Sequence, residues 1–256
     1  MTETATLATI ITALDLPSRA RVDTRVPKKM LVEQGAPTAT DKRAIQEGID
    51  ELQWIAALKP TTIAIPAFTD QTHDYSEIAV ISAVFRPNAR TTRLTELIHR
   101  AIPYPVLLIT MGAGGGALSV APKRAAQNEG DKVVVERLVL VGGIEPNAPS
   151  VAERSFLESL ALERQPARDL STVYEGWLTR IEALQAARLS GSYSAIDDAA
   201  LIERRHDALE THFRLTREII GLRAKATREK QLARRVDLNL EIQRLEADAA
   251  TYKSNL

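Results

Sequence analysis

Acidic side chains at close spacing are a natural place to look for chemistry, because carboxylates hold the metal ions of many nucleases. Asp70, Asp74 and Glu77 form such a group. A restriction-type site also needs an acid-x-Lys on a neighbouring strand, to hold the metal and a water. Glu77-Ile78-Ala79 lacks the lysine, and no Asp-x-Lys or Glu-x-Lys occurs in the sequence. The segment is therefore either an unorthodox magnesium site or, as we prefer, a polar hairpin turn with one charge at a strand edge.

A run of glycines at 112–116 is the second feature that could carry chemistry, since glycine-rich loops cradle phosphates. A P-loop needs Gly-Lys followed by Ser or Thr at the start of a helix. Here the glycines lead into Ala117-Leu118-Ser119-Val120, which is typical of a strand. We interpret the run as a flexible hairpin between two strands.

The histidines have no recognised metal-binding spacing. They are His73, His99, His206 and His212. The last two would lie on different faces of a helix. The sequence also has no cysteine, which excludes disulfides, thiolate zinc sites and a cysteine nucleophile. We therefore expect neither a metal site nor a cofactor.

Basic residues gather in two places, although the formal net charge of the chain is zero. Between 223 and 235 they could form a phosphate-facing stripe. The other group could form a basic rim on the sheet domain: Lys28, Lys29, Lys42, Lys123 and Arg124. For both groups the alternative is an ordinary solvated face. Aromatic residues make up only 4% of the chain, which weakens any interpretation that depends on base stacking.

The elements that would position these residues change character along the chain. Strand-like runs occupy 61–68, 75–85, 106–111, 117–121 and 132–141, with helical patterns at 7–14, from Thr38 to about Leu58, and at 90–101. Strand patterns then stop, and helices are expected at 151–162 and 170–189. We predict an α+β fold: an α/β domain at 1–145 with a mixed sheet of about five strands, then a helical domain at 146–256.

The last quarter of the chain, 199–252, has no proline and reads as one long helix of roughly 75 Å at ~1.5 Å per residue. Its apolar positions step by three and four, as in a coiled coil. We predict that Leu222, Val236 and Leu240 form the core of its seam. A second row begins at Leu238 and continues through Ile242, which we interpret as a stutter of the same helix. Such a helix must pack on the rest of the chain, on another copy or on a partner.

Targeting features are lacking in the sequence. The first eleven residues are polar and threonine-rich, and no apolar run approaches the ~18 residues that would span a membrane. Together with the absence of cysteine, this favours a cytoplasmic protein with no membrane partner.

Several segments in order resemble one family. They include Val26-Pro27-Lys28-Lys29, Lys59-Pro60-Thr61, Ala121-Pro122-Lys123-Arg124 and the run from Arg228 to Asn239. Together they are similar to the DUF4391 family, bacterial proteins of unknown function. The resemblance implies a helicase- or DNA methyltransferase-like neighbour in a restriction or antiphage system, and no catalytic residue. It marks Asp41, Glu77 and the basic rim as polar positions of interest, and also a patch on the long helix: Arg228, Lys230, Gln231, Arg235 and Asn239.

Three functional hypotheses remain at this point. The first is a non-enzymatic accessory subunit that docks a helicase- or methyltransferase-like protein and contacts DNA, if at all, through phosphates. The second is a metal-dependent nuclease that uses the acidic group. The third is a structural homo-oligomer built through the C-terminal helix.

Overall fold

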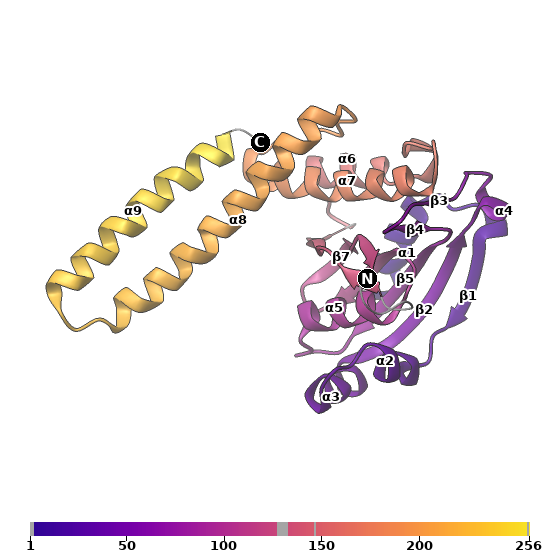
Figure 1. The fold of residues 1–256 in the computed structure, drawn as a ribbon, viewed down its shortest axis with the longest axis horizontal. Coiled ribbons are helices and arrows are strands. Elements are labelled where there is room, and N and C mark those ends of the chain that lie inside the picture. The colour runs from indigo at the N-terminus through magenta and orange to yellow at the C-terminus, as the bar shows by residue number, and fades with distance from the viewer. Residues whose placement is uncertain (1–2, 127–132, 146, 255) are drawn as a thin grey trace. The chain divides into compact units, whose positions relative to one another are not determined.

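The computed structural model describes residues 3–126, 133–145, 147–254 and 256 (Figure 1). The chain forms two compact units, Met1–Ile181 and Glu182–Leu256. The first contains the β-sheet, and the second contains a helical hairpin.

A six-stranded mixed sheet in the order β1-β2-β5-β6-β7-β10 is the centre of the first unit. Its strands are β1 (Arg21–Arg25), β2 (Ile49–Leu58), β5 (Ile78–Phe85), β6 (Val106–Gly112), β7 (Gly115–Val120) and β10 (Val139–Ile144). β5 and β6 pair in parallel, and the other neighbours pair antiparallel. Parallel strands need a crossover, which is α5 (Thr91–Ala101). Two short ribbons are separate from this sheet: β3 (Phe68–Thr69) with β4 (Asp74–Tyr75), and β8 (Lys123–Ala125) with β9 (Val133–Val135).

The first unit also contains α1 (Glu3–Ala13), α2 (Lys28–Gln34), α3 (Ala39–Gly48), α4 (Pro60–Ile63), α6 (Val151–Ser159) and the first part of α7 (Leu170–Ser190), with 3-10 turns η1 (Ser18–Ala20) and η2 (Leu162–Arg164). Leu31, Ile45 and Leu97, from α2, α3 and α5, share one buried cluster with Ile81 and Leu108 of the sheet. α1 packs against β6 and β7. β5 and β6 are buried along nearly their whole length, as expected for strands covered on both faces.

The α+β fold that the sequence predicts is therefore confirmed, with one more strand in the sheet than expected. The glycine run is also confirmed as a hairpin. Gly112 pairs with Gly115, so that Ala113 and Gly114 form the turn, and Gly115 has a φ of 86°. Gly116 allows close packing, because a Cβ there would lie 2.7 Å from Ile10 of α1.

The predicted helix ending near Leu58 is wrong in its second half, which is strand β2. Its buried residues Ile49, Leu52 and Ile55 are spaced by three, which mimics a helical period. The register between β2 and β5 shifts between Ile49 and Glu51 and again after Trp54. Each irregularity adds a residue and breaks the two-residue alternation of a strand.

Other predicted strand boundaries also differ from the structure. Segment 61–68 contains most of α4 and only the start of β3, and segment 132–141 divides between β9 and β10. Segment 19–33, for which no helix or strand is predicted above, contains most of η1, the short strand β1 and most of α2. Pro27 precedes α2 and Pro60 begins α4, and proline at the first helical turn is well tolerated.

The single long helix is also wrong: 199–252 folds as two helices, α8 (Ala199–Arg228) and α9 (Leu232–Ser254). Figure 1 shows them side by side, joined by a turn at 229–231. Leu222 and Ile219 of α8 share a buried cluster with Ile242 of α9, and Leu238 and Leu245 pack against it. The second apolar row is therefore the face of a second helix, not a stutter. Folding back lets the two rows bury each other within one chain.

The domain boundary predicted from the sequence is at 145, whereas the two compact units of the structure divide after Ile181. Among the described residues the last strand, β10, ends at Ile144. α6 and the first half of α7 nevertheless belong to the same compact unit as the sheet. Trp177 is fully buried and donates to the Leu160 carbonyl at 2.9 Å, and the Tyr174 hydroxyl donates to the Val106 carbonyl at 2.9 Å. Within the part of the chain that the structure describes, no helix combines the length and the apolar character needed to cross a membrane.

Candidate functional site

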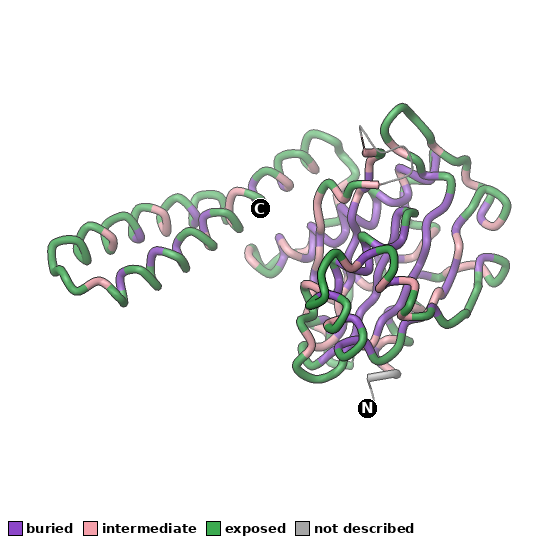
Figure 2. Tube along the Cα trace, turned by 60° about the horizontal axis from the view of Figure 1, so that its bottom comes forward, coloured by how far each residue is buried: buried purple, intermediate pink, exposed green. Residues whose placement is uncertain are grey.

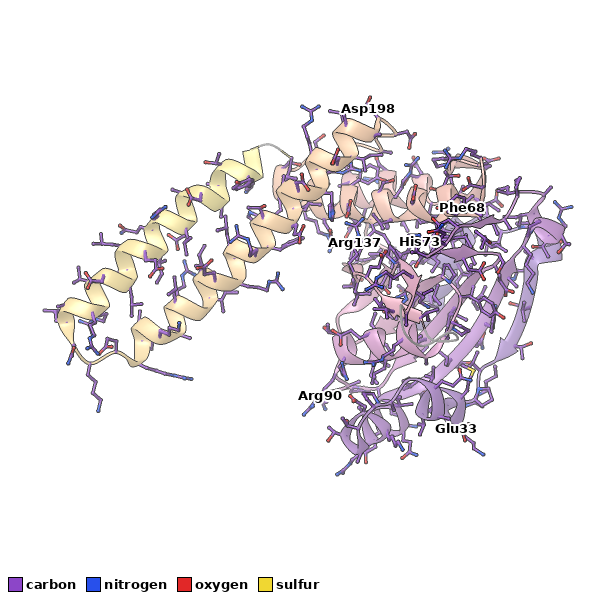
Figure 3. The ribbon with its side chains drawn as sticks, viewed as in Figure 1. Glu33, Phe68, His73, Arg90, Arg137 and Asp198 are labelled. Carbon is purple, nitrogen blue, oxygen red and sulfur yellow. The ribbon has the colours of Figure 1, made fainter. Side chains whose placement is uncertain are left out.

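The acidic residues Asp70 and Asp74 lie in the β3–β4 hairpin, near Phe68 and His73 (Figure 3). The Asp70 carboxylate accepts hydrogen bonds from the backbone N–H groups of Thr72 and His73, both at 2.7 Å. These bonds lower the pKa of Asp70. Asp74 accepts from the Ser76 N–H at 2.9 Å. Both carboxylates therefore stabilise a tight turn, as aspartates commonly do.

Glu77 has a different environment, because its side chain is buried and forms an ion pair. Its Oε2 lies 2.7 Å from the Lys59 Nζ, and this contact raises the pKa of Lys59. The three acids thus have different partners. Among the described residues, no group of three or more His, Asp or Glu side chains is placed to hold a metal ion.

The basic rim expected on the sheet domain is not one continuous surface. Lys123 is buried, its Nζ donates to the carbonyls of Ile102 and Tyr104, and burial lowers its pKa to about 7. Lys28 is half-buried and donates to the carbonyl of Ile49, the residue that follows α3. Both ammonium groups are therefore engaged with backbone oxygens rather than presented to a ligand.

The exposed members of the rim have acidic neighbours or stand apart. Lys29 pairs with Glu33 at 3.6 Å, and Arg124 lies 3.9 Å from Glu136. Lys42 is exposed on α3. Exposed pairs of this kind contribute little to stability, and they also reduce the local positive charge.

Asp41 is one of the polar positions that the family resemblance indicates, and it has a clear structural role. Its carboxylate accepts two hydrogen bonds from Arg93, Nε to Oδ1 at 2.9 Å and Nη2 to Oδ2 at 3.1 Å. A third comes from Thr38, the residue that caps α3. The bonds to Arg93 and Thr38 lower the pKa of Asp41 to about 2. The pair connects α3 to α5 and is structural.

His99 is a buried polar residue that the sequence does not distinguish. Its Nε2 lies 2.9 Å from the Ser119 hydroxyl of β7, and burial, with a smaller effect of nearby Lys123, holds its pKa well below the usual value. It is therefore a neutral side chain that joins α5 to the sheet. Neither this contact nor the Asp41–Arg93 pair has a local sequence signal, because each joins residues far apart in the chain.

Exposed cationic side chains concentrate at the turn of the α8–α9 hairpin, where Arg228, Lys230, Arg234 and Arg235 are all exposed. Figure 2 shows that most of the hairpin surface near this turn is exposed. Arg223, which is also exposed, donates from its Nη2 to Glu246 of α9 at 2.6 Å.

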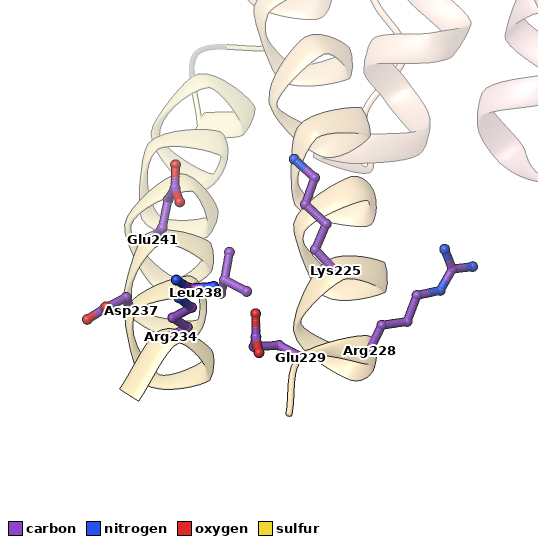
Figure 4. Close-up of a pocket in the computed structure, with 7 residues that line it drawn as sticks. All are labelled: Lys225, Arg228, Glu229, Arg234, Asp237, Leu238 and Glu241. Atoms are coloured by element: carbon purple, nitrogen blue, oxygen red, sulfur yellow. The ribbon is translucent and has the colours of Figure 1, made fainter. Parts of the chain in front are cut away.

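The two helix ends enclose an open cleft of about 560 Å³ at this turn. Figure 4 shows Arg228 pointing away from α9 while Leu238 points towards α8. The residues that line the cleft are Lys225, Arg228, Glu229, Arg234, Asp237, Leu238 and Glu241. Glu229 also accepts a hydrogen bond from the Gln231 N–H at 2.8 Å, which shapes the turn.

Comparison with known proteins identifies the family of this chain. The model of a family described as "Domain of unknown function (DUF4391)" matches residues 14–248. The chain belongs to the DUF4391 family. No curated protein and no solved structure matches the chain.

The DUF4391 match includes the hairpin as well as the sheet. It covers all of α8, the cationic turn and most of α9. Within the patch expected on the long helix, Arg228 ends α8, Lys230 and Gln231 lie in the connection, and Arg235 and Asn239 lie on α9. The patch that the sequence predicts on one helix is therefore divided between two helices and the turn that joins them.

Proposed function

We propose that this DUF4391 protein is a non-enzymatic accessory subunit of a bacterial DNA-transacting system of the restriction or antiphage type. In this proposal it docks a helicase- or methyltransferase-like protein and contacts DNA phosphates through the turn of the hairpin. The observation that carries the DNA contact is the cluster of exposed cations at that turn, which outnumber the acids Glu229 and Asp237 beside them. Phosphate contacts position a protein on DNA without reading its sequence.

The chemistry of the turn favours phosphates over bases as the contact. Arginine and lysine donate to phosphate oxygens, and arginine does so in a bidentate manner. Arg234 and Arg235 are adjacent on α9 and point in different directions, because consecutive helical residues are rotated by roughly 100°. We therefore expect two or three simultaneous phosphate contacts rather than one for every cation.

The polar groups of the sheet unit support a role without catalysis. Asp41 accepts hydrogen bonds from Arg93, Glu77 forms an ion pair with Lys59, and Lys123 donates to the Ile102 carbonyl. Each of these contacts has a structural role. No described observation favours the nuclease alternative over the accessory role. The dependence on a helicase- or methyltransferase-like partner rests on the family context alone.

A salt series with a fluorescent DNA duplex tests the phosphate contact. Each neutralised phosphate contributes about 0.9 to the slope of log affinity against log salt, so two or three contacts predict a slope of roughly −2 to −3. Arg234→Gln with Arg235→Gln should flatten this slope by ~1–2. The matched control Arg214→Gln with Arg217→Gln removes equal charge from exposed positions of α8 and should leave the slope unchanged. Absence of binding even at low salt would refute the DNA contact.

Recovery of partners from the native host tests the docking role separately. A tagged full chain should co-purify with a helicase- or methyltransferase-like protein, identified by mass spectrometry. Recovery without such a protein, from cells in which the neighbouring genes are expressed, would refute docking while leaving the DNA measurement valid.

A further inference from the structure

The face of α9 that points away from α8 carries a second regular pattern, which we name the outer seam. Its residues step alternately by three and four: Ala233, Val236, Leu240, Gln243, Ala247 and Ala250. All six are exposed. The sequence places Val236 and Leu240 in one seam with Leu222, but the structure separates them: Leu222 is buried between α8 and α9, whereas Val236 and Leu240 are 47% and 59% exposed. The inner row of α9, which includes Ile242, occupies the opposite side and faces α8.

The outer seam has the composition of a packing surface. Solvated helix faces are usually charged, whereas this one contains alanine, valine, leucine and a single glutamine. Its heptad spacing is the repeat that two helices need to wind around each other. The alanines would allow a close approach, and a polar residue in a seam often fixes the register of the pair.

The charges beside the outer seam indicate which partner it fits. Asp237 and Arg244 are seven residues apart, so they lie on nearly the same flank of α9. Among the described residues, neither side chain has a hydrogen-bond or ion-pair partner. If two copies of α9 pair antiparallel about a two-fold axis near Leu240, Asp237 of each copy faces Arg244 of the other. The seam is thus complementary to itself.

The first turn of α9 favours the same orientation, because it carries Arg234 and Arg235. A parallel pair would set these arginines of the two copies side by side, which is unfavourable. An antiparallel pair keeps them at opposite ends of the paired helices.

We infer that this protein forms a homodimer in which α9 packs antiparallel on α9 of a second copy, through the outer seam. This inference does not depend on the proposed DNA contact, because the cationic turns lie at the ends of the paired helices and not in the seam. The interface is a single helix pair, small beside specific interfaces that bury at least ~1,200 Å². We therefore expect a dissociation constant in the micromolar range and a mass that rises with concentration.

Sedimentation of the full chain from about 1 to 200 μM tests the dimer in a range that brackets a micromolar constant. Val236→Asp with Leu240→Asp should give a monomer at every concentration while the helical circular dichroism is retained. Ile220→Asp is the matched control, since Ile220 is a 61% exposed apolar residue of α8 outside the seam, and it should dimerise normally. A wild-type chain that stays monomeric throughout, or a dimer lost in Ile220→Asp alone, would overturn the inference.

A charge exchange tests the antiparallel orientation. Asp237→Arg alone, or Arg244→Asp alone, sets like charges opposite one another and should weaken the dimer by several fold. The combined variant restores both pairs in reversed sense and should recover wild-type association. If the combined variant is as weak as the single ones, the antiparallel pairing is wrong.

A single introduced cysteine tests the position of the two-fold axis. The chain has no cysteine of its own, so Leu240→Cys provides one thiol per copy. Facing residues of closely packed helices come within the ~4.4–6.8 Å between Cα atoms that a disulfide needs. Mild oxidation should cross-link Leu240→Cys rapidly and Ile220→Cys slowly. Equal rates for the two variants would place the axis elsewhere and contradict the inference.

Discussion

The guanidinium group of Arg93 holds the Asp41 carboxylate through two hydrogen bonds, at 2.9 and 3.1 Å, and so ties the start of α3 to the start of α5. The two residues are distant in sequence, and the contact joins two helices of the same buried cluster. It gives the sheet unit a stability that depends on pH.

Asp41→Asn should lower the stability of the sheet unit at neutral pH. The pKa of Asp41 is lowered to about 2, so the folded state binds fewer protons than the unfolded chain between that value and the ordinary aspartate pKa of about 4. The stabilising contribution is therefore present above pH ~4 and is lost as the pH falls towards 2. Urea unfolding at a series of acidic pH values should show a smaller decline for Asp41→Asn than for wild type. Parallel declines would contradict this.

Lys123→Met should remove a dependence of the free energy of unfolding on pH above neutrality. Burial lowers the pKa of Lys123 to about 7, whereas the unfolded chain keeps the ordinary value near 10.4. Between these values the unfolded state binds more protons, so stability should rise with pH, by up to ~1.4 kcal/mol per unit. The difference between wild type and Lys123→Met in urea unfolding from pH 7 to 9.5 measures this. Lys42→Met, at an exposed site, is the control and should behave as wild type does.

Leu222→Asp should unfold the α8–α9 hairpin, because Leu222 is 8% exposed in the cluster between the two helices. Burying a leucine contributes roughly 1.5–3 kcal/mol, and an unpaired buried charge adds a further cost. Circular dichroism at 222 nm should report the loss of helix. Leu240→Asp on the outer seam should retain full helicity at concentrations where the chain is monomeric, and the reverse result would refute the packing of the hairpin.

Magnesium or manganese should not induce cleavage of plasmid or single-stranded DNA by this protein. Glu77 is engaged with Lys59 at 2.7 Å, and the other two acids hold turns. Cleavage by the wild type that disappears in Glu77→Gln would contradict this expectation, provided that the variant remains folded. Such a loss could result from removal of a catalytic carboxylate or from the broken ion pair with Lys59. Lys59→Met separates these two explanations, because it breaks the ion pair and leaves the Glu77 carboxylate in place.

The sequence predicts features that depend on local patterns and fails where distant contacts decide. The glycine hairpin and the strand 106–111 follow from local composition, and both are confirmed. The sequence predicts a helix where strand β2 lies, because two register shifts give the buried residues of β2 a helical spacing. Those shifts depend on the neighbouring strand and have no signature within 49–58.

The C-terminal region shows the same limit at the level of a whole helix. Its two apolar rows are visible in the sequence, but no glycine or proline marks the turn at 229–231. The burial of Leu222 with Ile242, which lie twenty residues apart, shows that the rows belong to two helices. The sequence places Lys123 on a surface, because lysine is usually exposed. Its burial depends on the carbonyls of Ile102 and Tyr104, which lie in another segment of the chain.

Helix α7 determines where this chain can be divided into folded fragments. The helix runs from Leu170 to Ser190 without a break, and the boundary between the compact units falls within it, after Ile181. A fragment that stopped at 145 would lose the Tyr174 hydroxyl that bonds to Val106 and the Trp177 ring that is fully buried. The sheet should therefore be expressed as a soluble piece only when α7 is included, and a gene fusion that replaces the hairpin should be joined after Ser190.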